Sequence, residues 1–476
     1  MVINMARGEK KKELSLEEKL EQALVPVEEW PYGVPGNWCW VKLKEICEFE
    51  RGITFPASAK ENEKTEDNIA CLRTANVQDE LEIDDLIYVN KKFMKNNNLK
   101  LVKKDDIIMS SANSRELVGK TSYVHDMVYP MTFGGFVLNI RAKRVLSKYL
   151  FYMLRLEFLI GRFRGESTQT TNIANINTTI LGKYCFPLPP LSEQQRIVGR
   201  IESLFAKLDE AKEKAFNVVE QYDSKVNSIL CRAFIGDLSC EWRVMYGKKK
   251  EDWGIKKIKD VCRSRAGYAF DSKKFQNHGC QIIRMGNLYG GILDLSRSPV
   301  FIGEDELDKK IIERAKIENG DILITLTGTK YKRDYGYAVC IENAENLYVN
   351  QRILCLTPNT DINRDYLLYY LRSNFFRNIF FSNETGGVNQ GNVSSKFVEN
   401  IEIQVPSMEE QLVIATILKN ILWKEEQAKE LAECVLKQID LMKKSILAKA
   451  FRGELGTNNP EEESAIGLLK KILMEA

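Results

Sequence analysis

Residues 188–198 read LPPLSEQQRIV, and the character of the sequence changes at this stretch. Before it, short apolar runs alternate with polar loops, which is typical of strands and turns. Pro189 and Pro190 cannot donate backbone hydrogen bonds, so they favour the end of a strand. Ser192 is a residue type that commonly caps the start of a helix. The stretch therefore predicts a strand that gives way to a helix near Ser192.

The segment after Ser192 predicts one long helix. It contains no proline, and its apolar residues are spaced by three and four positions, as in the seam of a coiled coil. From Ser192 to Cys231 the helix would have 40 residues and a length of about 60 Å. Gly236 then suits a C-terminal cap. The expected seam residues are Ile197, Ile201, Leu204, Leu208, Ala211, Ala215, Val218, Tyr222, Val226 and Ile229.

The same arrangement occurs a second time. Residues 406–414 read PSMEEQLVI, and a second apolar stripe runs from there to a glycine at position 453. Two stripes of this kind in one chain predict that the two helices pack on each other. The second set of expected seam residues is Ile414, Ile417, Ile421, Ala428, Leu431, Val435, Ile439, Met442 and Ile446.

The duplication extends through the rest of the chain. GITF at 52–55 corresponds to GYAF at 267–270, an offset of 215 residues, and YLFYMLR at 149–155 corresponds to YLLYYLR at 366–372, an offset of 217 residues. A repeat this long is a domain with an appendage rather than one turn of a solenoid.

Each copy begins with a region of mixed structure. In the first copy we expect strands at 69–72, 86–89, 107–109 and 136–140 and a helix at 147–162. The predicted class is α+β, with two homologous mixed α/β domains in a pseudo-twofold arrangement, separated by two long antiparallel coiled-coil helices. The expected boundaries are a peripheral segment at 1–30, a domain at 31–190, a helix at 191–236, a domain at 237–405, a helix at 406–453 and a peripheral tail at 454–476.

Composition excludes several classes of protein. The 476 residues carry a net charge of only +3, so this is not a strongly basic, histone-like chain. The 11 cysteines form no C-x-x-C pair and there are two histidines, His125 and His278, so we expect neither a metal site nor a disulfide framework. No apolar run approaches the roughly 18 residues of a membrane span, and the start is charged, so we expect a cytoplasmic protein without membrane contact.

Motifs for catalysis by the chain alone are missing. Gly119-Lys120-Thr121 has the end of a phosphate-binding P-loop, but position 114 is serine where the motif needs glycine. The LPPL at 188–191 lacks the polar and aromatic residues of the Asn/Asp-Pro-Pro-aromatic run that amino-methyltransferases use. We therefore expect no catalytic residues and no cofactor.

Polar loops are the candidate binding elements. Arginine and lysine suit phosphate or guanine, while asparagine and glutamine suit adenine, so these loops fit DNA, although polar loops are more often simple solvated turns. In the first copy the candidates are Arg73, Asn76, Asn113, Arg115, Gln169 and Asn172, and in the second they are Arg284, Asn287, Lys330, Lys332, Arg333, Asn389, Gln390 and Asn392. Arg73, Asn76, Arg284 and Asn287 could instead be structural hydrogen-bonding residues at strand ends.

Residues 188–198 with the helix that follows, their second copy at 406–414, and VPGNWCW at 34–40 resemble the specificity subunits of type I restriction-modification systems. The resemblance covers nearly the whole chain. It implies two target recognition domains that read double-stranded DNA, held apart by two antiparallel helices. It also implies that the helices dock two modification subunits that methylate adenine, and that restriction subunits join the complex. Because the two domains differ in their loops, the target should be bipartite and asymmetric, with an unread spacer.

Two other classes of function stay open. A self-contained methyltransferase or endonuclease would need a cofactor or metal motif. A non-catalytic coiled-coil scaffold that spaces two protein-binding domains would lack the steep salt dependence of DNA binding.

Overall fold

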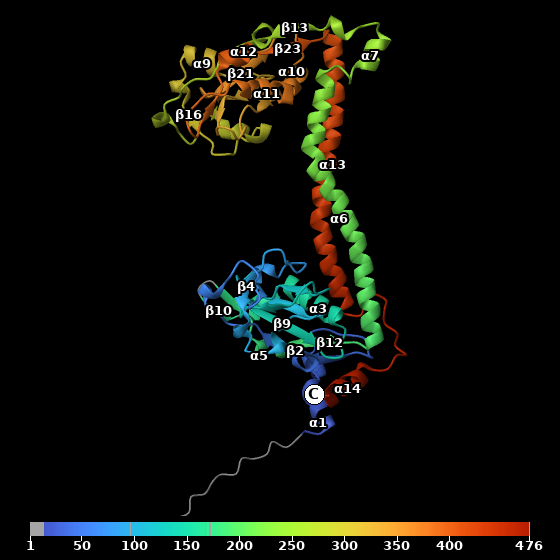
Figure 1. Cartoon of the computed structure of the whole chain (residues 1–476). Helices are drawn as coiled ribbons and strands as arrows, with labels where there is room; N and C mark the ends of the chain where they lie inside the picture. Colours follow the sequence, from blue (N-terminus) through green and yellow to red (C-terminus); the bar gives the residue numbers. More distant parts are fainter. Residues whose placement is uncertain (1–13, 96, 167, 171–172, 476) are drawn as a thin grey trace, which may run out of the picture. The chain divides into compact units, whose positions relative to one another are not determined.

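The computed structural model describes residues 14–95, 97–166, 168–170 and 173–475 (Figure 1). The chain divides into two compact units, one formed by Met1–Lys214 with Val435–Ala476 and the other by Ala215–Cys434. Each unit therefore combines one mixed α/β region with part of each long helix.

The first unit is built on two sheets. The larger sheet has the strand order β2-β9-β5-β7 and is antiparallel throughout. In the smaller sheet β3 lies between β4, which is antiparallel to it, and β8, which is parallel to it. The strands are β2 (Cys47–Arg51), β3 (Asn68–Leu72), β4 (Ile87–Asn90), β5 (Ile107–Ser110), β7 (Thr121–Tyr123), β8 (Met131–Phe133) and β9 (Val137–Ala142).

The second unit repeats this topology strand for strand. Its larger sheet has the order β14-β21-β17-β19, and its smaller sheet has β15 between the antiparallel β16 and the parallel β20. The duplication seen in the sequence is thus confirmed in the fold. The strands are β14 (Cys262–Ala266), β15 (Cys280–Ile283), β16 (Phe301–Ile302), β17 (Ile322–Thr325), β19 (Ala338–Cys340), β20 (Leu347–Val349) and β21 (Ile353–Pro358).

A two-stranded ribbon in each unit leads into the long helix. β1 (Cys39–Lys42) pairs with β12 (Cys185–Leu188), and β13 (Gly254–Lys257) pairs with β23 (Glu402–Val405). The predicted change from strand to helix at the prolines is therefore correct in both copies. Shorter helices complete the units: α2 (Leu43–Ile46), α3 (Ser147–Leu159), α4 (Arg162–Glu166), α5 (Thr178–Gly182), α7 (Cys240–Met245), α8 (Ile258–Val261), α9 (Lys309–Ala315), α10 (Arg364–Arg372), α11 (Asn374–Ser382) and α12 (Ser395–Glu399).

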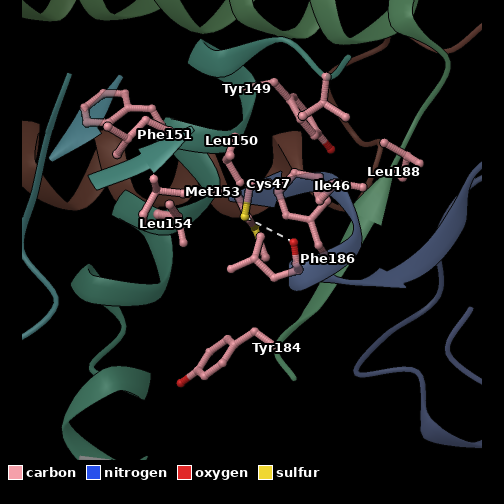
Figure 2. Close-up of a cluster of buried hydrophobic side chains, with 14 of the residues drawn as sticks. Ile46, Cys47, Tyr149, Leu150, Phe151, Met153, Leu154, Tyr184, Phe186 and Leu188 are labelled. Carbon is pink, nitrogen blue, oxygen red and sulfur yellow. Dashed lines mark hydrogen bonds between the residues drawn. The ribbon is translucent and has the colours of Figure 1, made fainter. Parts of the chain in front are cut away.

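The core of the first unit forms where α3 meets the ribbon (Figure 2). Tyr149 and Phe186 pack edge to face, with 5.6 Å between their ring centroids. The Tyr149 hydroxyl donates a hydrogen bond of 3.0 Å to the carbonyl of Pro187, so its one polar atom is satisfied inside the core. The helix expected at 147–162 ends at Leu159, because Gly161 takes a left-handed φ of +80° and separates α3 from α4.

The long helices are α6 (Leu191–Phe234) and α13 (Met408–Ala450), with 44 and 43 residues. They lie side by side in each unit (Figure 1). In the first unit Lys443 contacts Asp209, and in the second Tyr222 contacts Glu426 while Lys225 contacts Glu425. Residue numbers rise on one helix as they fall on the other, so the packing is antiparallel as predicted.

The expected seam is only partly correct. All ten positions expected on α6 are buried or half-buried. On α13, Ile414 and Ile439 are buried, but Leu431, Val435 and Met442 are exposed, and Ala432 is buried instead.

Two helices near the ends of the described chain pack on the first unit. α1 (Leu16–Ala23) and α14 (Ala465–Glu475) form near the expected positions, but α14 buries Leu469, Ile472 and Leu473 in the core of that unit. The tail expected at 454–476 thus contains a helix whose apolar face packs into the core of the first unit. Gly236 and Gly453 end the long helices at φ values of +90° and +75°, in agreement with the predicted caps. Within the described part of the chain, no helix is long and apolar enough to cross a membrane.

Candidate nucleic-acid interface

In the second unit a short pair of strands brings two polar loops together. β18 (Thr327–Gly328) pairs with β22 (Gly391–Asn392). The loop that follows β18 and the loop that precedes β22 therefore lie against each other. The Lys330 ammonium also donates a hydrogen bond of 3.2 Å to the carbonyl of Gly386, which ties the two loops directly.

These paired loops contain six of the candidate residues. Lys332, Asn389 and Gln390 are exposed, and Asn392 is half-buried in β22. Lys330 lies 5.1 Å from the centroid of the Tyr331 ring, and Arg333 donates a hydrogen bond of 3.2 Å to Asn378. The structure thus gathers Lys330, Lys332, Arg333, Asn389, Gln390 and Asn392 on one pair of loops.

Partly buried hydrogen bonds hold the shape of the loops. The Tyr335 hydroxyl donates a hydrogen bond of 2.7 Å to Glu384, which links the two loops from below, and burial raises the pKa of this tyrosine. The backbone N–H of Thr329 donates to the Asp334 carboxylate at 2.7 Å. Tyr331 and Arg333 take left-handed φ values of 67° and 52°, which turn the chain sharply between them. The exposed side chains therefore stand on an ordered backbone.

The first unit contains the equivalent pair of strands. β6 (Ala112–Asn113) pairs with β11 (Ile173–Asn175), which also pairs with β10 (Thr168–Thr170). Ala112 faces Asn175 in this pair, as Thr327 faces Asn392 in the second unit. The same backbone arrangement thus carries different side chains in the two units.

Two candidates of the first unit lie on this arrangement. The Asn113 amide donates a hydrogen bond of 3.0 Å to Ser110 and accepts one of 2.8 Å from the Ser114 backbone, whereas Arg115 is exposed in the following turn. Gln169 belongs to β10, for which only the backbone is described. Asn172 lies outside the described residues.

The remaining candidates are Arg73, Asn76, Arg284 and Asn287, whose side chains form hydrogen bonds within the protein at strand ends. Asn76 and Asn287 are each 2% exposed, and both follow the first strand of the smaller sheet. The Asn76 side chain accepts from the Arg73 backbone at 2.8 Å, and the Asn287 side chain accepts from the Arg284 backbone at 2.9 Å. Because these amides are enclosed and already bonded, we leave Asn76 and Asn287 out of the candidate interface. Arg73, paired with Asp85 at 2.8 Å, and Arg284, bonded to the Ser298 carbonyl at 2.7 Å, lie at the same strand ends.

Sequence reasoning did not identify a set of aromatic and arginine residues beside the loops of the second unit, formed by Tyr289, Arg297, Tyr337, Arg377 and Phe381. No motif or repeat block in the sequence marks these residues as a set, because hydrogen bonds and strand pairing in the structure are what align Tyr289, Arg297 and Tyr337 with the first copy. Among the described residues, no group of three or more histidine, cysteine, aspartate or glutamate side chains could hold a metal ion.

Comparison with known proteins gives one consistent family. The family model described as "Type I restriction modification DNA specificity domain" matches residues 35–221 and again 250–433. The EcoKI specificity subunit of Escherichia coli K12 is 23% identical over 93% of this chain and 96% of its own length. The MjaVIII specificity subunit of Methanocaldococcus jannaschii is 26% identical over 90% of this chain and 95% of its own.

Solved structures agree at the level of the fold. The HsdS subunit of Thermoanaerobacter tengcongensis matches with a TM-score of 0.61 and 18% identity, over 90% of this chain and all of that one. A chain from a structure of type I R-M system assembly and conformational transition matches with a TM-score of 0.66 and 19% identity, over 89% of this chain and all of that one.

Proposed function

The chain belongs to the type I restriction modification DNA specificity family, and we propose on this premise that it is the subunit that selects the DNA target of a type I restriction-modification complex. The observation that supports this most directly is the paired-strand arrangement, β6 with β11 and β18 with β22, which recurs in both units with different exposed side chains. Each unit reads one half of a bipartite target. Because the side chains differ, the two halves differ in sequence.

Within each unit the paired loops contact the DNA. Side chains on ordered loops can reach base edges, and neighbouring lysine and arginine side chains fix the position of the protein on the phosphates. In the second unit the exposed amides of Asn389 and Gln390 are suited to base edges, and Lys332 is suited to phosphate.

Binding of the full-length chain to random-sequence and selected duplexes tests this function. We expect selection from a random pool to return two different half-sites and an unselected spacer, and we expect affinity to fall steeply with salt. Affinity that does not depend on salt would favour the coiled-coil scaffold with two protein-binding domains. A single continuous or palindromic site would contradict one half-site per unit.

We further propose that the chain does not itself catalyse methyl transfer or cleavage. Its sequence has none of the cofactor motifs sought above, and the family is one of DNA specificity domains. Incubation of the purified chain with S-adenosylmethionine and target DNA should give no methylated adenine until a modification subunit is added. Methyl transfer by the chain alone would contradict this.

The long helices are the proposed docking sites for two modification subunits, and restriction subunits join through the assembled complex. In the second unit α6 and α13 leave large apolar side chains in solvent, with Phe216 55%, Trp423 63% and Leu431 66% exposed. Exposed apolar surface on a helix pair is a candidate for contact with another protein. Trp423→Ser should weaken capture of the modification subunit, whereas Ile292→Ser, at a 69% exposed apolar position outside the long helices, should not. Equal capture by both variants would place the docking site elsewhere.

A further inference from the structure

Arginine side chains and aromatic rings alternate beside the loops of the second unit. The Arg297 guanidinium lies 5.1 Å from the Tyr289 ring, which meets the Tyr337 ring edge to face at 5.8 Å. The Arg377 guanidinium lies 5.2 Å from both the Tyr337 and the Phe381 rings, and Arg333 lies 5.3 Å from Phe381. We refer to Arg297, Tyr289, Tyr337, Arg377, Phe381 and Arg333 as the arginine–aromatic series.

The series is continuous with the candidate interface. Arg377 donates to the backbone carbonyls of Gly336 at 3.0 Å and Arg333 at 2.9 Å, so it supports the loop after β18. Tyr289 and Tyr337 line a cleft of about 190 Å³ together with Gly328 of β18. Arg297, at the other end of the series, is therefore connected to the loops through packed rings.

The first unit has the opposite charge at the position of Arg297. Asn287 donates to the carbonyls of Asp294 and Arg297, both at 2.9 Å. Its counterpart Asn76 donates to the carbonyls of Glu82 at 3.1 Å and Asp85 at 2.9 Å. These bonds align Asp85 with Arg297, whereas the strand pairing and the bonds of Arg73 and Arg284 to the Asp85 and Ser298 carbonyls align Asp84 with Arg297. An aspartate stands at the position of Arg297 in either alignment.

The two rings also have polar counterparts. Tyr289 lies two residues after Asn287, as Gln78 lies two residues after Asn76. The backbone N–H of Tyr337 donates to the Thr325 hydroxyl at the end of β17. The strand pairing of β17 with β19 and of β5 with β7 makes Lys120 of the first unit the counterpart of Tyr337. Lys120 there donates a hydrogen bond to the Gln78 side chain. The polar pair Gln78 and Lys120 of the first unit thus corresponds to the aromatic pair Tyr289 and Tyr337 of the second unit. In the second unit Arg297 also stacks on Tyr289.

We propose that Arg297 binds a backbone phosphate of the DNA half-site read by the second unit, and that the first unit has no counterpart of this contact. Arg297 is exposed, and among the described residues no group accepts a hydrogen bond from its guanidinium. A guanidinium that stacks on a ring keeps its N–H edge free and loses little freedom when it binds phosphate. Arg377 differs, because its N–H groups already bond the loop carbonyls. In the first unit an aspartate at this place offers no N–H donor to a phosphate, and the Asp85 carboxylate is already paired with Arg73 at 2.8 Å.

This inference rests on the proposed DNA-binding function, and the dependence of affinity on salt tests the two separately. Each phosphate contact contributes about 0.9 to the slope of log K against log salt on B-DNA. In the full-length chain Arg297→Ala and Arg297→Gln should each lower that slope by about one on target and random duplexes alike, whereas Arg297→Lys should retain it. Lys273→Ala removes one exposed charge outside the series and should leave the slope unchanged.

Three outcomes would overturn the assignment while leaving the proposed function intact: a wild-type slope in both neutral variants, a loss confined to the target duplex, or an equal loss of slope in Lys273→Ala. A wild-type chain whose affinity does not depend on salt would instead contradict the proposed function itself. Thermal unfolding of each variant shows whether its fold is retained, and because Arg297 is on the surface, we expect all three to unfold like the wild type.

Discussion

The indole N–H of Trp38 donates a hydrogen bond of 2.7 Å to the buried carboxylate of Glu193. Trp253 makes the same bond, at 2.9 Å, to Glu410. Both glutamates belong to a repeated Pro-x-x-x-Glu-Gln run, at 189–194 and 406–411, and both tryptophans lie at the start of the ribbon that leads into a long helix. The glutamate therefore joins the first turn of each long helix to the α/β region of the same unit.

The glutamine that follows makes a second connection. Gln194 accepts from the Leu146 backbone at 2.8 Å, just before α3, and donates to the Pro189 carbonyl at 3.0 Å. Gln411 accepts from the Asn363 backbone at 2.7 Å, just before α10, and donates to the Pro406 carbonyl at 2.9 Å. The motif that the sequence makes most conspicuous is thus a junction between helix and sheet, apart from the candidate DNA-binding loops.

Loss of the Glu410 carboxylate should destabilise the second unit strongly. Arg243 and Glu410 form an ion pair of 2.6 Å in which both side chains are buried, and Ser239 adds a hydrogen bond of 2.7 Å to the same carboxylate. Glu410→Ala leaves the arginine charge buried without its partner, at a cost of about 3–5 kcal/mol. Glu409→Ala, at the exposed neighbouring position, should change the free energy of unfolding by less than about 0.5 kcal/mol. Denaturant unfolding measures both, and similar midpoints would show that the junction does not hold this unit together.

The equivalent glutamate of the first unit should make stability depend on pH. Burial raises the pKa of Glu193 above its ordinary value of 4.5. The folded chain then holds this proton more tightly than the unfolded chain, so the contribution of Glu193 to stability falls as pH rises from about 4.5 through the raised pKa. Glu193→Gln imitates the neutral form and keeps an acceptor for Trp38. The variant should gain stability relative to wild type at pH 7, and the gain should vanish below pH of about 4. Thermal midpoints across this range measure it, and a gain independent of pH would contradict the assignment.

Regularly spaced features of the chain were predictable from sequence. The sequence predicted the strand-to-helix change at Pro189 and Pro190 and the glycine caps correctly, because both depend on local backbone chemistry. It also predicted the duplication correctly, because the repeated blocks can be read directly from the sequence. The seam of α13 was less predictable because apolar residues adjoin, as at Leu431 and Ala432, and spacing alone does not decide which of them faces the partner helix. The structure buries the smaller residue.

The binding residues were harder to predict because burial depends on tertiary packing. Asn76 and Asn389 are the same residue type in polar surroundings, yet one is enclosed by backbone carbonyls and the other is exposed on a loop. Arg297 stands in a stretch of mixed polar and apolar residues with no motif of its own. Only hydrogen bonds and strand pairing in the structure align it with an aspartate of the first unit.

Two loop residues of the second unit should have different effects on DNA binding. Lys332 is exposed and suited to phosphate, so Lys332→Ala should weaken binding to all duplexes and lower the salt slope by about one. Gln390 is exposed and suited to a base edge, so Gln390→Ala should cost about 1–3 kcal/mol on the target and change the preference in one half-site only. Equal losses on target and random duplexes for both variants would contradict this division.

We expect the neighbours of Lys332 and Gln390 to divide in the same way, into residues that contact phosphates and residues that contact base edges. Lys330→Ala and Arg333→Ala should weaken binding to every sequence, although both side chains also bond their own loops and part of the loss will come from altered loop structure. Asn392→Ala should act on the preference of the same half-site as Gln390→Ala. A changed preference in the first half-site would show that the two units do not read independently.

Lengthening both long helices should change the spacer and leave the half-sites unchanged. The antiparallel contacts of Asp209 with Lys443 and of Tyr222 with Glu426 show which parts of α6 and α13 lie opposite each other. One heptad inserted in α6 between Glu213 and Val219, with another in α13 after Glu430, keeps the apolar seams in phase. Each helix becomes roughly 10 Å longer, which corresponds to about 3 bp of B-DNA.

Such a variant should select the same two half-sites with a longer unread spacer. Three extra base pairs also rotate one half-site by roughly 100° about the DNA axis, so twisting or bending must absorb the mismatch and affinity should fall. A heptad inserted in α6 alone is the control, because it breaks the pairing of the seams and should destabilise the helix pair without selecting a new spacer. Site selection from a random pool decides the matter: an unchanged spacer in a folded variant with both insertions would mean that the helices do not measure the distance between half-sites.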